Sequence, residues 1–396
     1  MLKAPHHTLV RALSCALITA SACSSTVSMT VSDAPPLDAS DAVIAPEIAP
    51  PRDVGSPPDV ARPDVTPPSL DGGVALRGSL STGQADTCEL TTEGRVRCWG
   101  GNTYGELGDG TTMRRDGVVE ARDLQGVTQI SGGVGHTCAL LSDRTVSCWG
   151  LNTYGAVGNN LEVVRPSPAP VLGLSDVTQV AAGWWHTCAL LSNGTARCWG
   201  SNSHEQLGVS GAFRSVGPVE VEGLRDAVEI ATGFEYSCAR LADHTVRCWG
   251  ANLTNAGGGA STTTRAVTIE GLRDVASIAV GSRRACALLR DGTMRCWGEN
   301  RNGELGDGTL TDRAAPTIVV GLRDAVQIAV GGNTCALLAD GTVSCWGYSS
   351  TSGLVITPTT VAGLRDVVEL VAGSQHVCVH LSDRTVRCWP TGGVRM

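Results

Sequence analysis

The segment CALLSDRTVSCWG at residues 138–150 decides the fold, because the chain contains seven versions of it. Each version has two cysteines ten positions apart and a Trp directly after the second cysteine. The versions start about 50 residues apart, shortening to 43 before the last one. A period of this size, with only short apolar runs inside it, is typical of a propeller or a solenoid. We expect one repeat to form one blade.

The turn inside each version predicts the register of a β-hairpin. In four repeats the third turn residue is Gly, which suits a type I turn followed by a left-handed residue. This turn places Cys138 opposite Cys148, and directly opposed residues of an antiparallel pair lie near the distance that a disulfide needs. Arg144, His244 and Arg384 replace the Gly in the other repeats. Those three turns must either accept a positive φ or change their type.

Fourteen cysteines can therefore form seven staples, one in each blade. The expected pairs are Cys88 with Cys98, Cys138 with Cys148, Cys188 with Cys198, Cys238 with Cys248, Cys286 with Cys296, Cys335 with Cys345 and Cys378 with Cys388. Such bonds need an oxidising compartment. Reduced thiols and zinc are the alternatives, but zinc sites favour the close CxxC type of spacing, which these repeats do not offer.

The N-terminus predicts export. Lys3 and Arg11 precede an apolar run that is too short to span a bilayer, so residues 1–22 are expected to be a signal peptide. Residues 20–23, Ala-Ser-Ala-Cys, resemble a lipoprotein cleavage box, although that box usually has Leu three residues before the Cys. Cys23 is therefore the expected lipid attachment site of a cell-envelope protein, at the outer membrane or cell surface. The alternative is a secreted protein with a spare thiol.

A proline-rich stretch follows the signal. Ten of the eighteen prolines lie between residue 24 and Pro68, interleaved with Asp, Ala and Val. Such a composition cannot bury a core, so we expect residues 23–67 to be a disordered, extended tether and residues 68–396 to be the folded domain.

Charge excludes one class of partner. The formal net charge is −8, of which the signal contributes +2 and residues 24–72 contribute −6, leaving −4 for the rest. A domain this close to neutral lacks the basic footprint of a nucleic-acid-binding protein. Membrane contact would have to come from a lipid on Cys23, and we expect the protein to be a monomer.

Each repeat contains four strand signals, which predict an all-β propeller of seven four-stranded antiparallel blades. A small-residue run such as VTQISGG comes first, the two hairpin strands follow, and a fourth run such as PAPVLGL or APTIVVGL ends the repeat. The last repeat stops at Trp389-Pro390 without a fourth run, whereas residues 68–72 align with the fourth run at residues 358–363. We expect this N-terminal segment to complete the seventh blade and close the ring.

The repeat GxxHTCALLxDGTVxCWGxNxxGELGDGT, as in residues 183–200 and 300–309, resembles that of the regulator of chromosome condensation family, whose fold is a seven-bladed propeller. The resemblance covers about residues 68–396 and indicates an exported bacterial branch. Nuclear members exchange guanine nucleotide on a small GTPase and bind chromatin, while exported members look like protein-binding propellers. An exported chain with a disulfide in each blade and no basic tail would encounter neither the small GTPase nor chromatin. Nucleotide exchange is therefore not expected.

Polar residues of the repeat do not predict an active site. His136, His186 and His376 occupy one repeat position, which favours a structural role. The Asp residues of the hairpin turns have an expected role in backbone hydrogen bonding. Asp109 and Asp307 suggest calcium, but no DxDxDG loop accompanies them. The repeats also faintly resemble the Asp-box of sialidases, but they have no arginine cluster at matching positions. We therefore expect no enzyme, no cofactor and no metal.

Large residues at variable loop positions predict a binding patch. Its members lie where strands one and two of consecutive repeats are joined: Trp184, Trp185, Phe234, Tyr236, Arg283 and Arg284. Aromatic and Arg side chains are typical of interface hot spots, so we expect a protein-interaction module with an unknown protein partner. The alternatives are that Trp184 and Trp185 plug the channel, or that the same face belongs to a carbohydrate-binding protein or carbohydrate-active enzyme.

Overall fold

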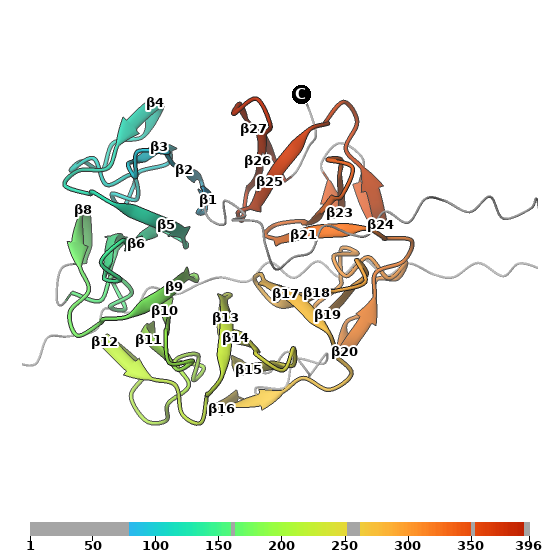
Figure 1. Ribbon diagram of the computed structural model, residues 1–396, viewed down its shortest axis with the longest axis horizontal. Helices are drawn as coiled ribbons and strands as arrows, with labels where there is room; N and C mark the ends of the chain where they lie inside the picture. The colour runs from blue at the N-terminus through green and yellow to red at the C-terminus, as the bar shows by residue number, and fades with distance from the viewer. Residues whose placement is uncertain (1–78, 160–162, 252–261, 350–352, 392–396) are drawn as a thin grey trace, which may run out of the picture. The chain divides into compact units, whose positions relative to one another are not determined.

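The computed structural model describes residues 79–159, 163–251, 262–349 and 353–391. These residues form 27 strands and no helix. The strands make seven antiparallel sheets arranged as a ring (Figure 1), six with four strands and one with three. The seven-bladed propeller predicted from the repeats is confirmed. The expected signal peptide, tether, Cys23 lipid site and closing segment at residues 68–72 lie outside the described residues.

The strands of each blade run in sequence order from the central channel to the rim. The first strands are β1 (Leu80–Thr82), β5 (Val127–Gly132), β9 (Val177–Ala182), β13 (Ala227–Thr232), β17 (Val275–Val280), β21 (Ala325–Val330) and β25 (Val367–Ala372). The second strands are β2 (Asp86–Leu90), β6 (His136–Leu141), β10 (His186–Leu191), β14 (Tyr236–Leu241), β18 (Arg284–Leu289), β22 (Thr334–Leu338) and β26 (His376–Leu381). The third strands are β3 (Val96–Gly100), β7 (Val146–Leu151), β11 (Ala196–Ser201), β15 (Val246–Ala251), β19 (Met294–Gly298), β23 (Val343–Ser349) and β27 (Val386–Pro390). The fourth strands are β4 (Arg115–Glu120), β8 (Val164–Pro170), β12 (Arg214–Glu220), β16 (Thr262–Thr268), β20 (Arg313–Ile318) and β24 (Gly353–Thr360).

The predicted hairpin register is confirmed. Cys138 pairs with Cys148 across β6 and β7, and Leu140 pairs with Val146. All seven expected cysteine pairs lie at disulfide distance, with Cα atoms 4.0 to 4.1 Å apart. The three turns without Gly keep their type and accept the left-handed conformation, with φ of 65° at Arg144, 65° at His244 and 69° at Arg384.

The predicted limits of the fourth strands are wrong by a few residues. The run PAPVLGL was expected to be a strand, but β8 starts earlier and ends at Pro170. The reason is that Val171 and Leu174 leave the sheet and enter an apolar cluster between blades, while Gly173 turns the chain with φ of 77°. Each link therefore anchors the junction to the next blade.

Apolar clusters join consecutive blades. Six such clusters are present among the described residues, and each contains the repeat Trp of the second blade of its pair. Trp149 shows the arrangement, since its ring is fully buried and its Nε1 donates to the carbonyl of Glu106 in the preceding blade at 2.6 Å. Burial of an aromatic ring at every such junction stabilises the ring of blades strongly.

Glutamine side chains reinforce the junctions beside the channel, a cavity of about 540 Å³ lined by the first strands. Gln179 of β9 donates to the Ile230 carbonyl of β13 at 3.1 Å and accepts from the Ile230 amide at 2.8 Å. Gln129 and Gln327 hold Val180 and Leu370 in the same way. Each amide thus bridges two first strands much as a backbone group bridges strands within a sheet.

The junction between the last and first blades differs from the other six. No apolar cluster spans it among the described residues, and Trp99, the repeat Trp of the first blade, is only half-buried. Polar contacts hold this junction instead. The Ser79 hydroxyl donates to the Glu369 carboxylate, and His380 lies 3.7 Å from Glu89 across the two blades.

Candidate interaction surface

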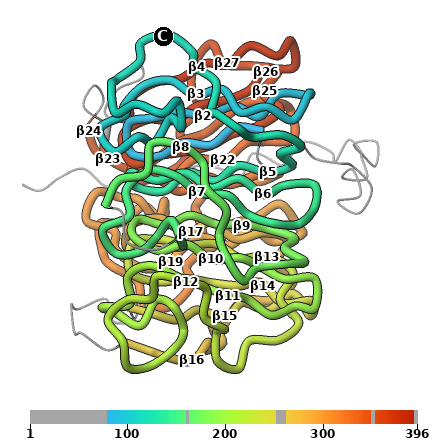
Figure 2. The backbone as a smooth tube through the Cα atoms, turned by 90° about the vertical axis from the view of Figure 1, so that its left-hand side faces the viewer, coloured from blue at the N-terminus to red at the C-terminus, as the bar shows by residue number. Residues whose placement is uncertain are grey.

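The propeller has two distinct faces, and Figure 2 shows the ring edge-on. Loops joining strands one to two lie beside the ends of the third strands, as in the hydrogen bond from the Ser201 amide to the Trp185 carbonyl at 2.8 Å. We call this side the loop face. The hairpin turns contact the links between blades, as in the bond from the Ser192 amide to the Asp176 carbonyl at 2.9 Å, and we call that side the turn face.

Four aromatic side chains form one contiguous group on the loop face. We call Tyr154, Trp184, Trp185 and Phe234 the aromatic cluster. The Trp184 and Phe234 ring centroids are 4.5 Å apart, those of Trp185 and Phe234 are 5.0 Å apart, and those of Tyr154 and Trp185 are 5.6 Å apart. The rings meet at tilted or edge-on angles, which is the favoured geometry for aromatic pairs. All four side chains are half-buried, so the cluster is held in place while part of it faces solvent.

The channel opens beside this cluster. A cavity of about 350 Å³ at the mouth is lined by Trp184 but not by Trp185, Phe234 or Tyr154. One indole thus borders the mouth, whereas the other three rings do not line it. The alternative in which both Trp side chains plug the channel thus agrees with the position of Trp184 but not with that of Trp185.

Two exposed arginines lie on the loop face as well. Arg283 is exposed on the loop of the fifth blade. Arg214 is also exposed and lies over the ring of Phe213, with its guanidinium carbon 5.4 Å from the ring centroid. Neither guanidinium has an ion-pair partner within the part of the chain that the structure describes. Arg214 donates to the Thr153 carbonyl at 3.1 Å, and both guanidinium groups keep N–H donors that an acidic group of a partner could use.

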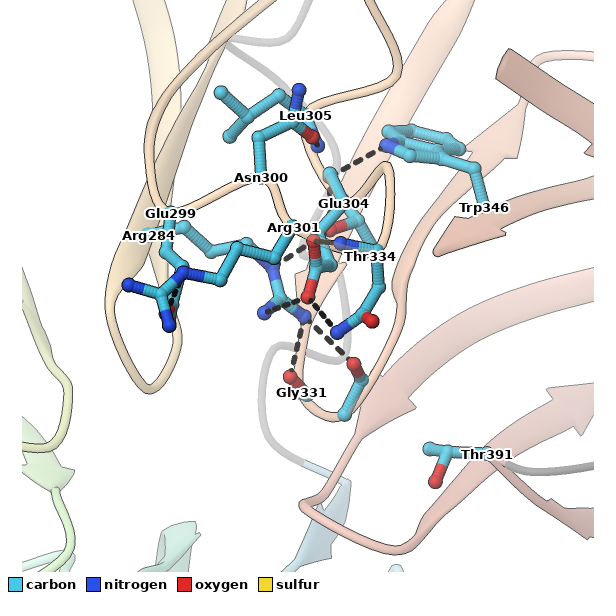
Figure 3. Close-up of polar contacts among 12 residues, drawn as sticks. Arg284, Glu299, Asn300, Arg301, Glu304, Leu305, Gly331, Thr334, Trp346 and Thr391 are labelled. Atoms are coloured by element: carbon cyan, nitrogen blue, oxygen red, sulfur yellow. Dashed lines mark hydrogen bonds and ion pairs between the residues drawn. The ribbon is translucent and has the colours of Figure 1, made fainter. Parts of the chain in front are cut away.

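Tyr236 and Arg284 do not belong to the exposed patch, so this part of the sequence prediction is wrong. Tyr236 is 1% exposed, and its hydroxyl donates to the carbonyl of Arg284. Arg284 is 5% exposed, and Figure 3 shows its guanidinium directed at the next blade. It donates to the carbonyl of Gly331 at 2.7 Å and to the Thr334 hydroxyl at 3.2 Å, and lies 3.9 Å from Glu304. Both residues occupy the repeat position of His136, which points between blades.

The histidines at this repeat position also bridge blades. His136 Nε2 lies 2.9 Å from the Thr187 hydroxyl, and His186 Nε2 lies 2.9 Å from the Ser237 hydroxyl. Burial lowers the pKa of His136 to about 4 and that of His186 to about 3, so both rings are neutral at physiological pH. These imidazoles therefore make hydrogen bonds between neighbouring blades.

The first blade has a buried acid, Asp86, at this repeat position. The sequence did not indicate that its pKa would be raised. Asp86 is 3% exposed, and burial together with the nearby Glu106 carboxylate raises its pKa to about 8. Burial raises the pKa of Glu106 as well. In the fifth blade the corresponding residues are Arg284 and Glu304, which carry opposite charges. The first blade therefore contains a pair of acids where the fifth contains an ion pair.

The carboxylates considered for calcium are engaged by protein donors. Asp109 accepts from the Thr111 amide at 2.9 Å and from the Arg115 guanidinium at 2.9 Å. Asp307 has the same contacts to Thr309 and Arg313. These bonds hold the loop between strands three and four. Among the described residues, no group of three or more metal-ligating side chains is found.

Comparisons with known proteins give the repeat its family. One profile of the regulator of chromosome condensation (RCC1) repeat matches residues 127–156, 177–206 and 275–304, and a second matches residues 93–140, 145–190 and 291–338. The matched residues are RCC1 repeats, and the described repeats form a seven-bladed propeller. No curated protein matches this RCC1-repeat chain in sequence.

Solved structures resemble the RCC1-repeat propeller in fold. Prp20p from Saccharomyces cerevisiae has a TM-score of 0.65 and 21% identity, with 75% of this chain and 80% of that chain covered. Human WBSCR16 has a TM-score of 0.67 and 22% identity, with coverage of 76% and 85%. The ectodomain of the Arabidopsis thaliana receptor kinase ACR4 has a TM-score of 0.52 and 21% identity, with coverage of 80% and 96%. At these identities the likeness concerns the fold alone.

Proposed function

We propose that this protein is a non-enzymatic, exported interaction module that binds a protein partner through the loop face. The observation that carries the proposal is the aromatic cluster, which offers four half-buried rings in contact, with the exposed Arg214 and Arg283 on the same face. Buried aromatic and Arg anchors contribute most of the binding free energy in typical interfaces. A cluster whose rings already contact one another also loses little side-chain freedom when a partner binds.

Two further observations support the proposal. Prp20p, which shares the fold, is described as binding Gsp1p and histones, and has been solved with Kap60. Seven cysteine pairs at disulfide distance favour an oxidising location such as the periplasm or cell surface. We place the protein there as a monomer, anchored by a lipid on Cys23. None of the described residues forms a helix that is long and apolar enough to cross a membrane.

The second candidate is carbohydrate binding by the same face, because adjacent half-buried indoles also offer flat apolar surfaces to a sugar ring. A glycan array separates the two candidates. Strong glycan binding that is lost when Trp184 and Trp185 are changed to Ala favours the carbohydrate alternative, whereas an array without signal favours a protein partner.

Site-directed photo-cross-linking in intact cells tests the proposed function. A photoreactive Phe analogue replaces Phe234 on the loop face, and in a matched variant it replaces the exposed Arg273 on the turn face. We expect one discrete protein adduct from position 234 and none from position 273. Equal capture from the two positions, or capture from position 273 alone, contradicts binding through the loop face.

A further inference from the structure

Arg214 departs from the pattern of its repeat. In the first blade, an ion pair of 2.9 Å between Arg115 and Asp109 holds the loop between strands three and four. The third blade has Ser215 and Val209 at the corresponding positions, and its arginine comes one residue earlier. Arg214 is therefore not part of a loop-holding ion pair of this kind.

Two contacts hold the Arg214 guanidinium in place at the surface. Its Nη1 donates to the carbonyl of Thr153 in the second blade at 3.1 Å, and its central carbon lies 5.4 Å from the centroid of the Phe213 ring. The residue is nevertheless exposed, and a guanidinium has more N–H donors than this single bond uses. The remaining donors belong to a planar fork that matches a carboxylate. Arg214 thus offers a pre-oriented binding group to an anion.

Arg214 lies beside the aromatic cluster. The residue after Thr153 is Tyr154, a member of the cluster. The next residue, Gly155, packs so closely against β12 that an added Cβ would lie 2.8 Å from the Cα of Val216. Arg214 and Val216 both belong to β12, the outermost strand of the third blade. The loop that carries Tyr154 therefore contacts β12 on both sides of Tyr154, which places Arg214 next to the cluster.

The dimensions of the cluster suit a short peptide segment. The ring centroids of Trp184 and Trp185 are 6.3 Å apart, and those of Trp185 and Tyr154 are 5.6 Å apart. A length of about 12 Å corresponds to three or four residues of extended chain at about 3.3 Å each. Neighbouring rings are inclined to one another by 47° to 86°, so they do not form one continuous flat surface on which a sugar could stack. Apolar side chains of a peptide can fill the angles between the rings.

We propose that Arg214 is an anion-binding residue of the interaction surface, and that the partner protein presents to it an acidic side chain at one end of a short apolar segment. The carboxylate accepts from the free N–H groups of Arg214 near the rim, while the apolar residues lie on the aromatic cluster toward the channel mouth. Charge complementarity at one end of the surface thereby fixes the direction of the bound segment. This inference rests on the proposed function, because it takes the aromatic cluster as the surface that the partner contacts.

Random short peptides displayed on phage provide the probe, and the full-length protein is the target. Selected peptides are tested against the Trp184→Ala, Trp185→Ala double variant, which identifies those that bind the loop face. We expect these peptides to be enriched in Asp and Glu next to apolar residues. Synthetic copies of them should bind Arg214→Glu at least about tenfold more weakly than the natural chain, since two like charges then meet.

Two further variants separate a specific contact from general charge. Arg214→Lys keeps the charge but loses the planar fork, so it should restore only part of the affinity. Arg114→Glu is the matched control, because Arg114 is the corresponding exposed residue of the first blade and is paired with Asp116 at 3.1 Å. It changes the net charge equally and should alter the affinity by less than about twofold. Replacing the acidic residue of a peptide by Lys should recover binding to Arg214→Glu.

The outcomes that overturn the inference differ from those that overturn the proposed function. Peptides that need Trp184 and Trp185 but show no preference for acids, or bind Arg214→Glu as tightly as the natural chain, overturn the role of Arg214 and leave the loop face as the interaction surface. Peptides that bind without regard to the two Trp residues contradict the proposed function as well. A library that yields no peptide also overturns the inference, and binding of a uronate oligosaccharide that depends on Arg214 would assign the anion to a glycan instead.

Discussion

The amide bridges beside the channel make a quantitative prediction about stability. Changing Gln179 to Met keeps a side chain of similar length and removes both hydrogen bonds to Ile230, the 3.1 Å donation and the 2.8 Å acceptance. A neutral hydrogen bond contributes about 1 kcal/mol net, and an unpaired, partly buried backbone group costs somewhat more. We therefore expect the free energy of unfolding to fall by about 2 to 3 kcal/mol. For a domain of roughly 310 residues, with an unfolding entropy near 2.1 cal/mol/K per residue, the melting temperature should fall by about 3 to 5 °C.

Thermal unfolding followed by circular dichroism, with the disulfides intact, measures this effect. The matched control is Ser277→Ala, because Ser277 occupies the same repeat position in the fifth blade and makes no side-chain hydrogen bond among the described residues. We expect the control to lie within about 0.5 kcal/mol of the parent. A Gln179→Met variant as stable as the parent, or a control that costs as much, refutes the view that the amide bridges stabilise the junctions.

Two further predictions concern the acid pair and the closing segment. Since the pKa of Asp86 is raised to about 8 in the folded protein, the folded state favours the protonated acid, and its contribution to stability is lost as pH rises from about 4 through 8. The free energy of unfolding of Asp86→Asn, measured in urea, should therefore equal that of the parent at pH 4 and exceed it by a few kcal/mol above pH 8. If the variant and the parent differ by the same free energy at both pH values, the assignment is wrong. Deleting residues 24–60 should leave the melting temperature almost unchanged, whereas deleting residues 24–72 should lower it clearly by uncovering β27. Equal melting temperatures for the two truncated proteins exclude ring closure by residues 68–72.

The architecture could be predicted from the sequence because the same pattern of strands and turns occurs in seven repeats, so irregularities of a single repeat do not hide it. A turn of fixed length sets the register of every hairpin. The two cysteines of each hairpin therefore lie opposite each other in every blade, as Cys138 and Cys148 do in the second. Even the turn at Arg144 keeps its conformation, since the flanking strands determine the turn more strongly than one residue does.

The site was predictable only in part. The loop positions of Trp184, Trp185 and Phe234 could be read from their place before the repeat His, but the direction of the next side chain could not. Tyr236 and Arg284 look like hot-spot residues by type, yet a strand that alternates inward and outward places them between blades. The amide bridges, the acid pair and the polar junction join residues some 20 to 300 positions apart, so no local pattern indicates them.

The most direct test of the account is the affinity of the cross-linked partner for variants of the two faces, measured by isothermal titration calorimetry. Changing Trp184 and Trp185 together to Ala should cost more than about 2 kcal/mol of binding free energy, roughly thirtyfold in Kd, without lowering the melting temperature much. Changing Arg273 and Arg323 on the turn face to Ala should cost little. Normal binding by the Trp double variant, or a loss of binding that occurs only because this variant unfolds, would contradict the assignment of the loop face as the interaction surface.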